Sequence, residues 1–175
     1  MAFDDCFKKV RLKNGIEVVF RAITHGDKER MHALFDSFSP QTVYFRFFAP
    51  IGVMTDEALE HYLDVDFIHA VAIVASVRKG GKEHLIAIAR YYADEKKPEM
   101  AEFAIVVADD WQKRGIGTKL MKHLCRVAKG RGVKIFNALV FKENGEMFKL
   151  LGRLGYPWEK RKFDEDTERV EVYLE

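Results

Sequence analysis

The stretch that decides the fold runs from Met100 to Arg131 and reads MAEFAIVVADDWQKRGIGTKLMKHLCRVAKGR. Residues 101–108 are apolar apart from one acid, which is typical of a buried strand. Residues 116–128 carry apolar side chains three or four positions apart, which is the spacing of a helix. A polar turn that contains two glycines joins the two segments. The sequence therefore predicts a strand, a glycine-containing turn and a helix in direct succession.

The turn has the properties of an anion-binding site. Gly115 and Gly117 allow a bulky group to approach the backbone closely, and the first turn of a helix offers N–H groups without partners in the helix. The positive end of the helix dipole lies there too, so phosphate is a favoured occupant. We expect a diphosphate at this turn, with the reactive arm of the same molecule along the preceding strand. The expected contacts, mostly through backbone N–H groups, come from Gln112, Lys113, Arg114, Gly115, Ile116, Gly117 and Thr118.

Two other phosphate-binding motifs fit less well. A P-loop needs a glycine directly before its lysine, whereas Thr118 precedes Lys119 here. A dinucleotide fingerprint needs a third glycine where Leu120 stands, and it opens an early βαβ unit rather than lying past the middle of the chain. The remaining alternatives are a turn whose glycines serve only packing, and a nucleotide-phosphate site in the same turn.

Gln112-x-x-Gly115-x-Gly117 after such a strand resembles the acyl-CoA-binding motif of the GNAT superfamily of N-acetyltransferases. A second segment is similar to this family, because Asn144 precedes a helical pattern that ends in Leu154-Gly155-Tyr156. Residues 39–47, Ser-Pro-x-x-x-Tyr-x-Arg-Phe, resemble more narrowly the acetyltransferase domains of bacterial protein-lysine acetyltransferases. The resemblance implies acetyl-CoA as cosubstrate and a primary amine as acceptor, with a protein lysine favoured. A small amine or amino-acid-like acceptor, or a non-catalytic acyl-CoA sensor, remain alternatives.

The order of the predicted elements is that of a GNAT-like fold, α/β of the mixed α+β kind, with a mostly antiparallel mixed sheet and helices on both faces. We expect one domain over residues 1–175, with an N-terminal hairpin in 1–22 and the acyl-CoA-binding strand, turn and helix in 99–131. Predicted helices begin after Asp27, Ser39 and Thr55 and near 115 and 143. Predicted strands lie in 6–13, 16–23, 69–77, 84–93, 101–108, 133–141 and, as a pair, 161–174.

Composition limits the classes of function. A formal net charge of +2 argues against a dedicated nucleic-acid binder, and no apolar run reaches the roughly 18 residues that span a membrane. The N-terminus lacks the apolar core of a signal peptide, and two cysteines do not indicate a disulfide framework. The six histidines show no metal-binding spacing, so no metal is expected. We therefore expect a cytoplasmic protein, and the resemblance above implies a bacterial enzyme. The sequence leaves monomer and homodimer open.

Glu102 is the candidate catalytic base. It interrupts an apolar strand, where a carboxylate is costly unless it is paired or functional. It also falls early on this strand, where the resemblance implies a catalytic glutamate. Burial would make it a better acceptor for the proton of the amine, taken directly or through a water. The alternative is a structural ion pair with Arg90 on the neighbouring strand, and Glu99 at the turn is the reserve base.

The remaining candidates follow from the resemblance. It implies that this strand parts from its neighbour and that a freed N–H of Ile105, Val106 or Val107 meets the thioester oxygen. Asn144 is expected either to contact the pantetheine arm or to cap the following helix. Many members carry a tyrosine as general acid where Leu151 stands here. The aromatic run 44–48 is expected to be mostly core, with any exposed members along the acceptor groove.

Overall fold

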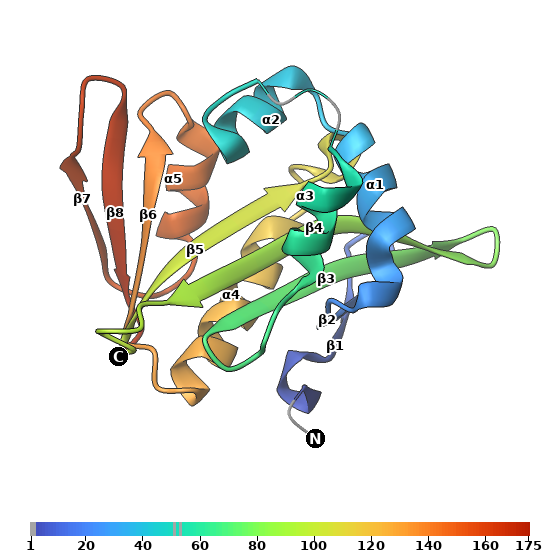
Figure 1. Cartoon of the computed structure of the whole chain (residues 1–175), viewed down its shortest axis with the longest axis horizontal. Coiled ribbons are helices and arrows are strands. Elements are labelled where there is room, and N and C mark those ends of the chain that lie inside the picture. Colours follow the sequence, from blue (N-terminus) through green and yellow to red (C-terminus); the bar gives the residue numbers. More distant parts are fainter. Residues whose placement is uncertain (1–2, 51, 53) are drawn as a thin grey trace.

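The computed structural model describes residues 3–50, 52 and 54–175 of the chain (Figure 1). Residues 1–2, which belong to the predicted N-terminal segment 1–22, lie outside the described residues. The strands are β1 (Lys8–Arg11), β2 (Glu17–Ala22), β3 (Ala70–Lys79), β4 (Lys82–Ala93), β5 (Met100–Val107), β6 (Ile135–Phe141), β7 (Trp158–Lys162) and β8 (Thr167–Tyr173). The helices, with 3₁₀ turns written η, are η1 (Asp4–Cys6), η2 (His25–Asp27), α1 (Lys28–Asp36), α2 (Pro40–Phe47), α3 (Asp56–Leu63), η3 (Asp109–Trp111), α4 (Ile116–Gly130) and α5 (Gly145–Gly152).

These strands form one mixed sheet in the order β1-β2-β3-β4-β5-β6-β8-β7. β1 to β5 run as successive antiparallel neighbours, as do β6, β8 and β7. β5 and β6 are parallel, as expected when the helix α4 connects two neighbouring strands. The mostly antiparallel mixed sheet predicted from the sequence is therefore confirmed.

Helices cover both faces of the sheet, and each face has its own core (Figure 1). On one face, α1 and α3 bury Leu34 and Leu59 against the sheet. On the other face, α4 and α5 bury Leu120 and Leu151. β3 lies between both layers, and its residues 70–77 are all buried. The two cores hold β3, β4 and β5 in place from both faces, so a site at the ends of these strands rests on well-packed structure.

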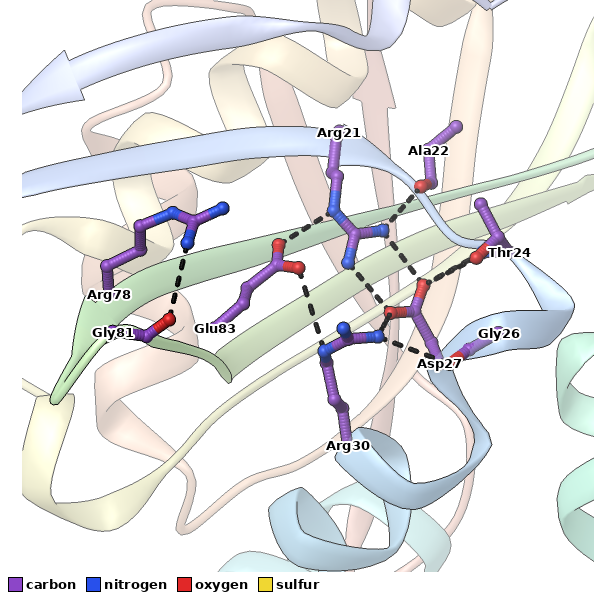
Figure 2. A network of polar contacts seen from close by, with 9 residues as sticks. All are labelled: Arg21, Ala22, Thr24, Gly26, Asp27, Arg30, Arg78, Gly81 and Glu83. Carbon is purple, nitrogen blue, oxygen red and sulfur yellow. Dashed lines mark hydrogen bonds and ion pairs between the residues drawn. The ribbon is translucent and has the colours of Figure 1, made fainter.

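A network of charged side chains ties the start of α1 to the sheet, as Figure 2 shows. The carboxylate of Asp27 is fully buried and accepts hydrogen bonds from Arg21 Nη2 at 2.7 Å and Arg30 Nη1 at 3.2 Å. Arg21 Nε also donates to Glu83 on β4 at 2.9 Å. Burial opposes the charge on Asp27, but the guanidinium of Arg21 and the Thr24 N–H outweigh it and lower the pKa of Asp27. The network therefore fixes α1 to β2 and β4.

Three predicted helix starts are confirmed by capping contacts, whereas Asp27, also expected to cap a helix, makes no side-chain capping hydrogen bond to α1. Ser39 Oγ accepts from Thr42 N, Thr55 Oγ1 accepts from Ala58 N, and Asn144 Oδ1 accepts from Met147 N, each at 3.2 Å. Such contacts satisfy N–H groups that the first turn leaves without partners. α2, α3 and α5 therefore begin with satisfied N-termini.

Candidate active site

β5 and β6 part soon after they pair. Their parallel ladder runs only from Met100 to Glu102 on β5, opposite 135–137 on β6. Beyond this point β5 stays paired with β4 up to Val107, while β6 pairs with β8 as far as Phe141. The two strands therefore diverge into a wedge, and the backbone groups on the β6 side of β5 lose their ladder partners.

The hydrogen-bond alternation of β5 decides which amides face this wedge. Ala108 N donates to Ile86 O on β4 at 2.8 Å, so even-numbered residues of β5 direct their backbone groups toward β4. Odd-numbered residues direct theirs toward β6, as the contact from Asn137 Nδ2 to Ala101 O at 3.3 Å shows. Of the three candidate amides, those of Ile105 and Val107 therefore face the wedge, whereas that of Val106 faces β4.

The wedge opens into a cavity of about 720 Å³. Its walls come from β5, the turn before α4, α5, β6 and α2, which explains how distant segments of the chain meet at one site. Most of the residues predicted from the sequence line it: Glu102, Ile105, Val106, Val107, Gln112, Lys113, Gly115, Gly117, Thr118 and Asn144.

The N-terminus of α4 ends in this cavity without a cap. Gly115 is the N-cap residue with φ +82°, and in the described part of the chain no side chain caps this helix. A Cβ on Gly115 would meet nothing within 4 Å, so the space beside it is open. A Cβ on Gly117 would lie 3.2 Å from Leu150 Cδ1 and 3.5 Å from Val107 Cγ2. Gly117 therefore serves close packing, while Gly115 leaves the helix terminus accessible to a ligand.

Three residues of the predicted diphosphate site direct their side chains elsewhere. Ile116 is 1% exposed and belongs to the core. The guanidinium of Arg114 stacks over the ring of Trp111 at 4.8 Å. Gln112 Nε2 donates to Val107 O at 3.0 Å and to Thr42 Oγ1 at 3.3 Å, so its side chain ties the turn to β5 and α2. These three residues can contribute only backbone groups to a diphosphate.

Glu102 is exposed, so the expectation that burial makes it a better base is wrong. It lies on the face of β5 opposite the α4 core, beside Tyr92 of β4. Its side chain lines the cavity. Among the described residues it has no ion pair with Arg90, whose guanidinium instead donates to Tyr62 O and Tyr92 Oη. The structural ion pair offered as the alternative is therefore not formed, and the carboxylate is accessible from the cavity. Glu99, the reserve base, is exposed at the turn before β5 and does not line the cavity.

A second, smaller cavity of about 340 Å³ adjoins the first. Both cavities are lined by Glu102 and Arg46, so the carboxylate lies where they meet. The second cavity lies on the face of the sheet that α1 and α3 cover. Its other walls are His61, Tyr62, Arg90, Tyr92, Phe103 and Ala104.

The expectation that the aromatic run 44–48 is mostly core is wrong. No residue of α2 is buried, because the helix lies over the open wedge rather than over the sheet. Tyr44 and Phe48 each stack on Phe141 of β6 with ring centroids 4.6 Å apart, and Phe45 and Phe48 line the large cavity. α2 therefore bridges the two diverging strands. Asp109 holds its start in place by accepting from Ser39 N at 2.9 Å.

The cavity is also lined by residues that the sequence did not assign to the site, on and beside α2 and α5 and on β5 and β6. The apolar ones have the spacing of core residues and the polar ones resemble ordinary surface residues, so no periodic pattern distinguishes them. They are Gln41, Thr42, Phe103, Ala104, Ala138, Leu139, Val140, Glu146, Met147, Lys149, Leu150 and Arg153.

The sequence model of the Acetyltransferase (GNAT) family matches residues 29–156 of the chain. This chain belongs to the GNAT family. The match includes β5, the uncapped α4 terminus and α5, which are the elements that build the large cavity. The chain is therefore an acetyltransferase by family, and its cavity lies where β5 and β6 diverge.

Two curated relatives of similar sequence are named as acetyltransferases. An acetyltransferase of Pseudomonas aeruginosa is 31% identical over 145 residues, which cover 83% of this chain and 77% of the relative. The protein named Acetyltransferase Pat in Mycolicibacterium smegmatis is 36% identical over 149 residues, which cover 85% of this chain. The match covers only 44% of Pat, so the chain corresponds to less than half of that longer protein.

Solved structures show the same fold. The GNAT domain of S. lividans PAT superposes with a TM-score of 0.84 at 30% identity, covering 96% of this chain and 97% of that domain. A cAMP-binding acyltransferase from Mycobacterium smegmatis, at 30% identity and a TM-score of 0.62, covers 99% of this chain but only 48% of that protein. The GNAT fold predicted from the sequence is thereby confirmed.

The resemblance implies a general-acid tyrosine in many members at a position where this chain has a leucine. Leu151 stands there, and it is fully buried in the core beneath α5 rather than in the cavity. Tyr156 is partly buried against the same core, and burial raises its pKa. Neither residue offers a hydroxyl to the cavity.

The described residues contain neither a membrane-spanning helix nor a metal-binding cluster. No helix there is long and apolar enough to span a membrane. No group of three or more histidine, cysteine or acidic side chains in that part of the chain is arranged to hold a metal ion.

Proposed function

We propose that this GNAT domain moves an acetyl group directly from acetyl-CoA to a primary amine, with a protein lysine as the favoured acceptor. The observation that carries the proposal is one continuous cavity that contains the uncapped α4 terminus, the free side of β5 and the carboxylate of Glu102. These three features supply a site for the diphosphate, a polarising group and a base.

The cavity fits coenzyme A in size and chemistry. Its volume of about 720 Å³ is within the usual range of small-molecule sites. The backbone N–H groups of residues 115–118 would donate to a diphosphate bound there, and the positive end of the α4 dipole would favour it. Lys113, which is exposed at the rim and has φ +60°, adds positive charge beside them. The pantetheine arm would then lie in the wedge between β5 and β6.

The reaction requires a polarised carbonyl and an amine without its extra proton. The N–H of Ile105 or Val107 faces the wedge and would donate to the thioester oxygen as negative charge develops there. Glu102 would take the proton from the ammonium group, directly or through a water, since it is open to solvent. The amine nitrogen then attacks the carbonyl carbon and passes a second proton to water, the carbonyl re-forms as the carbon–sulfur bond breaks, and the leaving thiolate takes a proton from water. Holding both reactants in one cavity supplies part of the rate by itself.

The preference for a protein lysine rests on two observations. Residues 39–47 resemble those of bacterial protein-lysine acetyltransferases, and the chain is similar to Pat and to the GNAT domain of S. lividans PAT. Residues 39–47 also form α2, which covers the cavity, so the resemblance lies at the site itself. Acetylation-site mass spectrometry after incubation with acetyl-CoA and a cell lysate would identify the acceptor.

The test of the mechanism is Glu102→Gln, assayed by thiol release from acetyl-CoA with a lysine peptide. We expect acetyl-CoA binding to persist and turnover to fall by about 10²–10⁴-fold, the usual contribution of a general base. Glu99→Gln is the matched control, because Glu99 is an exposed glutamate three residues away that does not line the cavity. Unchanged turnover of Glu102→Gln across pH would exclude Glu102 as the base. Acetyl-CoA binding without thiol release from any amine would instead favour the non-catalytic sensor.

A further inference from the structure

The smaller cavity is lined by two arginines, Arg46 and Arg90, as well as by the proposed base Glu102. Arg90 is only 7% exposed, and Arg46 is partly buried on α2 above it. In the part of the chain that the structure describes, neither guanidinium has a carboxylate within ion-pair distance. Arg21 on β2 differs, because it forms an ion pair with the buried Asp27.

Aromatic rings hold the two guanidinium groups in place. Arg90 lies 4.3 Å from the ring centre of Tyr62 and 5.1 Å from that of Tyr92. Its Nη1 donates to Tyr62 O at 3.2 Å and its Nη2 donates to Tyr92 Oη at 3.0 Å. Arg46 Nη2 donates to Tyr62 Oη at 2.8 Å and stacks over Phe47 at 4.9 Å. All these partners are neutral, and Glu102, the acid among the described residues that line this cavity, forms no ion pair with either group, so neither guanidinium has a direct anionic partner.

An uncompensated arginine in a cavity favours an anionic ligand. Burying a charge without a partner is costly, so a buried guanidinium with donors to spare is best satisfied by an anion. Arginine has five N–H donors, and Arg90 uses two of them in the contacts above. The planar fork of its remaining donors matches the two oxygens of a carboxylate.

The register of the sheet places this anion site beside the proposed base. Glu102 pairs with Tyr92, and Arg90 pairs with Ala104, so Glu102 and Arg90 are diagonal neighbours on adjacent strands. Diagonal neighbours have Cβ atoms roughly 7–8 Å apart. One acceptor molecule can therefore place its amine at Glu102 and a carboxylate at the arginines.

We infer that the acceptor of this acetyltransferase carries a carboxylate beside its reactive amine, and that Arg90 and Arg46 bind that carboxylate in the smaller cavity. The inference rests on the proposed function, since it names the acceptor of the same site. The carboxylate belongs either to a free amino-acid-like amine or to an acidic residue or C-terminus next to a target lysine. The arginines also favour loss of the ammonium proton, because positive charge close to an amine lowers the pKa of that amine.

The test compares acceptors that differ only in this carboxylate. The first pair is Nα-acetyl-lysine and Nα-acetyl-lysine amide, which differ in the α-carboxylate. The second pair is acetyl-Gly-Lys-Asp-amide and acetyl-Gly-Lys-Asn-amide, which differ in a side-chain carboxylate. For the native protein we expect kcat/KM with acetyl-CoA to be about 10-fold or more higher for the acid in at least one pair, as for a hydrogen bond to a charged group. The pair that shows the preference identifies the source of the carboxylate.

Variants connect this preference to the two arginines. Arg90→Met and Arg46→Met should each bring the ratio of kcat/KM within a pair close to one, whatever their effect on the neutral acceptor alone. Arg46→Met covers the case in which Arg90→Met does not fold, because Arg46 lies on a helix without buried residues. Arg78→Met is the control, since Arg78 lies at the β3–β4 hairpin, contacts Gly81 O and lines neither cavity (Figure 2). It should leave the ratio unchanged.

Two results would overturn the inference. A native ratio near one in both pairs, with thiol released from the neutral acceptors, removes the anion site but leaves the acetyltransferase proposal intact. If both arginine variants still prefer the acidic acceptor of a pair, the carboxylate of that acceptor binds at another site. Absence of thiol release with every amine would remove the proposed function together with this inference, so the two failures are distinguishable.

Discussion

Gly115→Ala tests whether the uncapped terminus of α4 binds the diphosphate. Gly115 has φ +82°, a conformation that costs an alanine about 1–2 kcal/mol. A Cβ there meets no atom within 4 Å, so the methyl group causes no clash in the protein itself. It would instead occupy the open space beside the N–H groups that are proposed to contact the phosphates. We therefore expect a modest loss of stability and a separate loss of coenzyme A affinity.

Gly132→Ala is a matched control for the backbone strain. Gly132 has φ +88°, lies just beyond the other end of α4, and also leaves a Cβ with no atom within 4 Å. It does not line the cavity. Both variants should therefore lose about 1–2 kcal/mol of stability, and in a chain of this length each kcal/mol lowers Tm by about 2–4 °C. Only Gly115→Ala should lose affinity.

The assay is thermal unfolding with and without coenzyme A. A ligand at 100 times its Kd stabilises a protein by about 2.7 kcal/mol, and a 10-fold weaker Kd reduces this to about 1.4 kcal/mol. Loss of one or two hydrogen bonds to a charged phosphate is enough for such a 10-fold change. If Gly115→Ala keeps the full stabilisation by coenzyme A, or if Gly132→Ala loses it equally, the α4 terminus is not the diphosphate site.

Two further predictions concern single side chains. Asn144→Ala should destabilise the protein by about 1 kcal/mol in urea unfolding, because it removes the α5 cap, whereas Asn144→Asp should retain the cap. If Asn144→Asp also keeps its affinity for coenzyme A, the amide of Asn144 does not contact pantetheine. His123 is 2% exposed, and burial lowers its pKa below the usual 6.5, so the unfolded chain binds this proton more readily. The contribution of His123 to the free energy of unfolding should therefore be full above about pH 6.5 and decrease as the pH falls below it. Between pH 7.5 and 5.5, the His123→Gln variant should lose less stability than the native protein. An identical loss in both proteins would show that His123 does not contribute.

The site was partly predictable because its central elements are local in sequence. The strand 101–108, the glycine turn and the amphipathic helix are consecutive, so periodicity and the positions of Gly115 and Gly117 indicate them without tertiary information. The two glycines nevertheless have different roles. Gly115 leaves space open, whereas Gly117 is packed against Leu150, a residue 33 positions later whose contact the sequence does not reveal.

Other parts of the site depend on contacts between distant segments. α2 reads as a core helix because its aromatic residues have helical spacing, and only the divergence of β5 and β6 shows that it lies over a cavity. The exposure of Glu102 has the same origin, since a strand flanked by apolar residues predicts burial until its neighbours are known. The choice among the amides of β5 likewise needs the register with β4.

The sequence by itself determined the element order, the mixed sheet, the strand–turn–helix of the acyl-CoA motif and the membership in the GNAT family, because each depends on residues within one or two neighbouring elements. Only the tertiary structure decided that Ile105 and Val107 face the wedge, that Glu102 is open to two cavities, and that Arg46 and Arg90 line one cavity without an ion pair to a carboxylate. The physical reason is that a cavity arises where packing and strand pairing stop. Where they stop depends on how elements far apart in the chain meet.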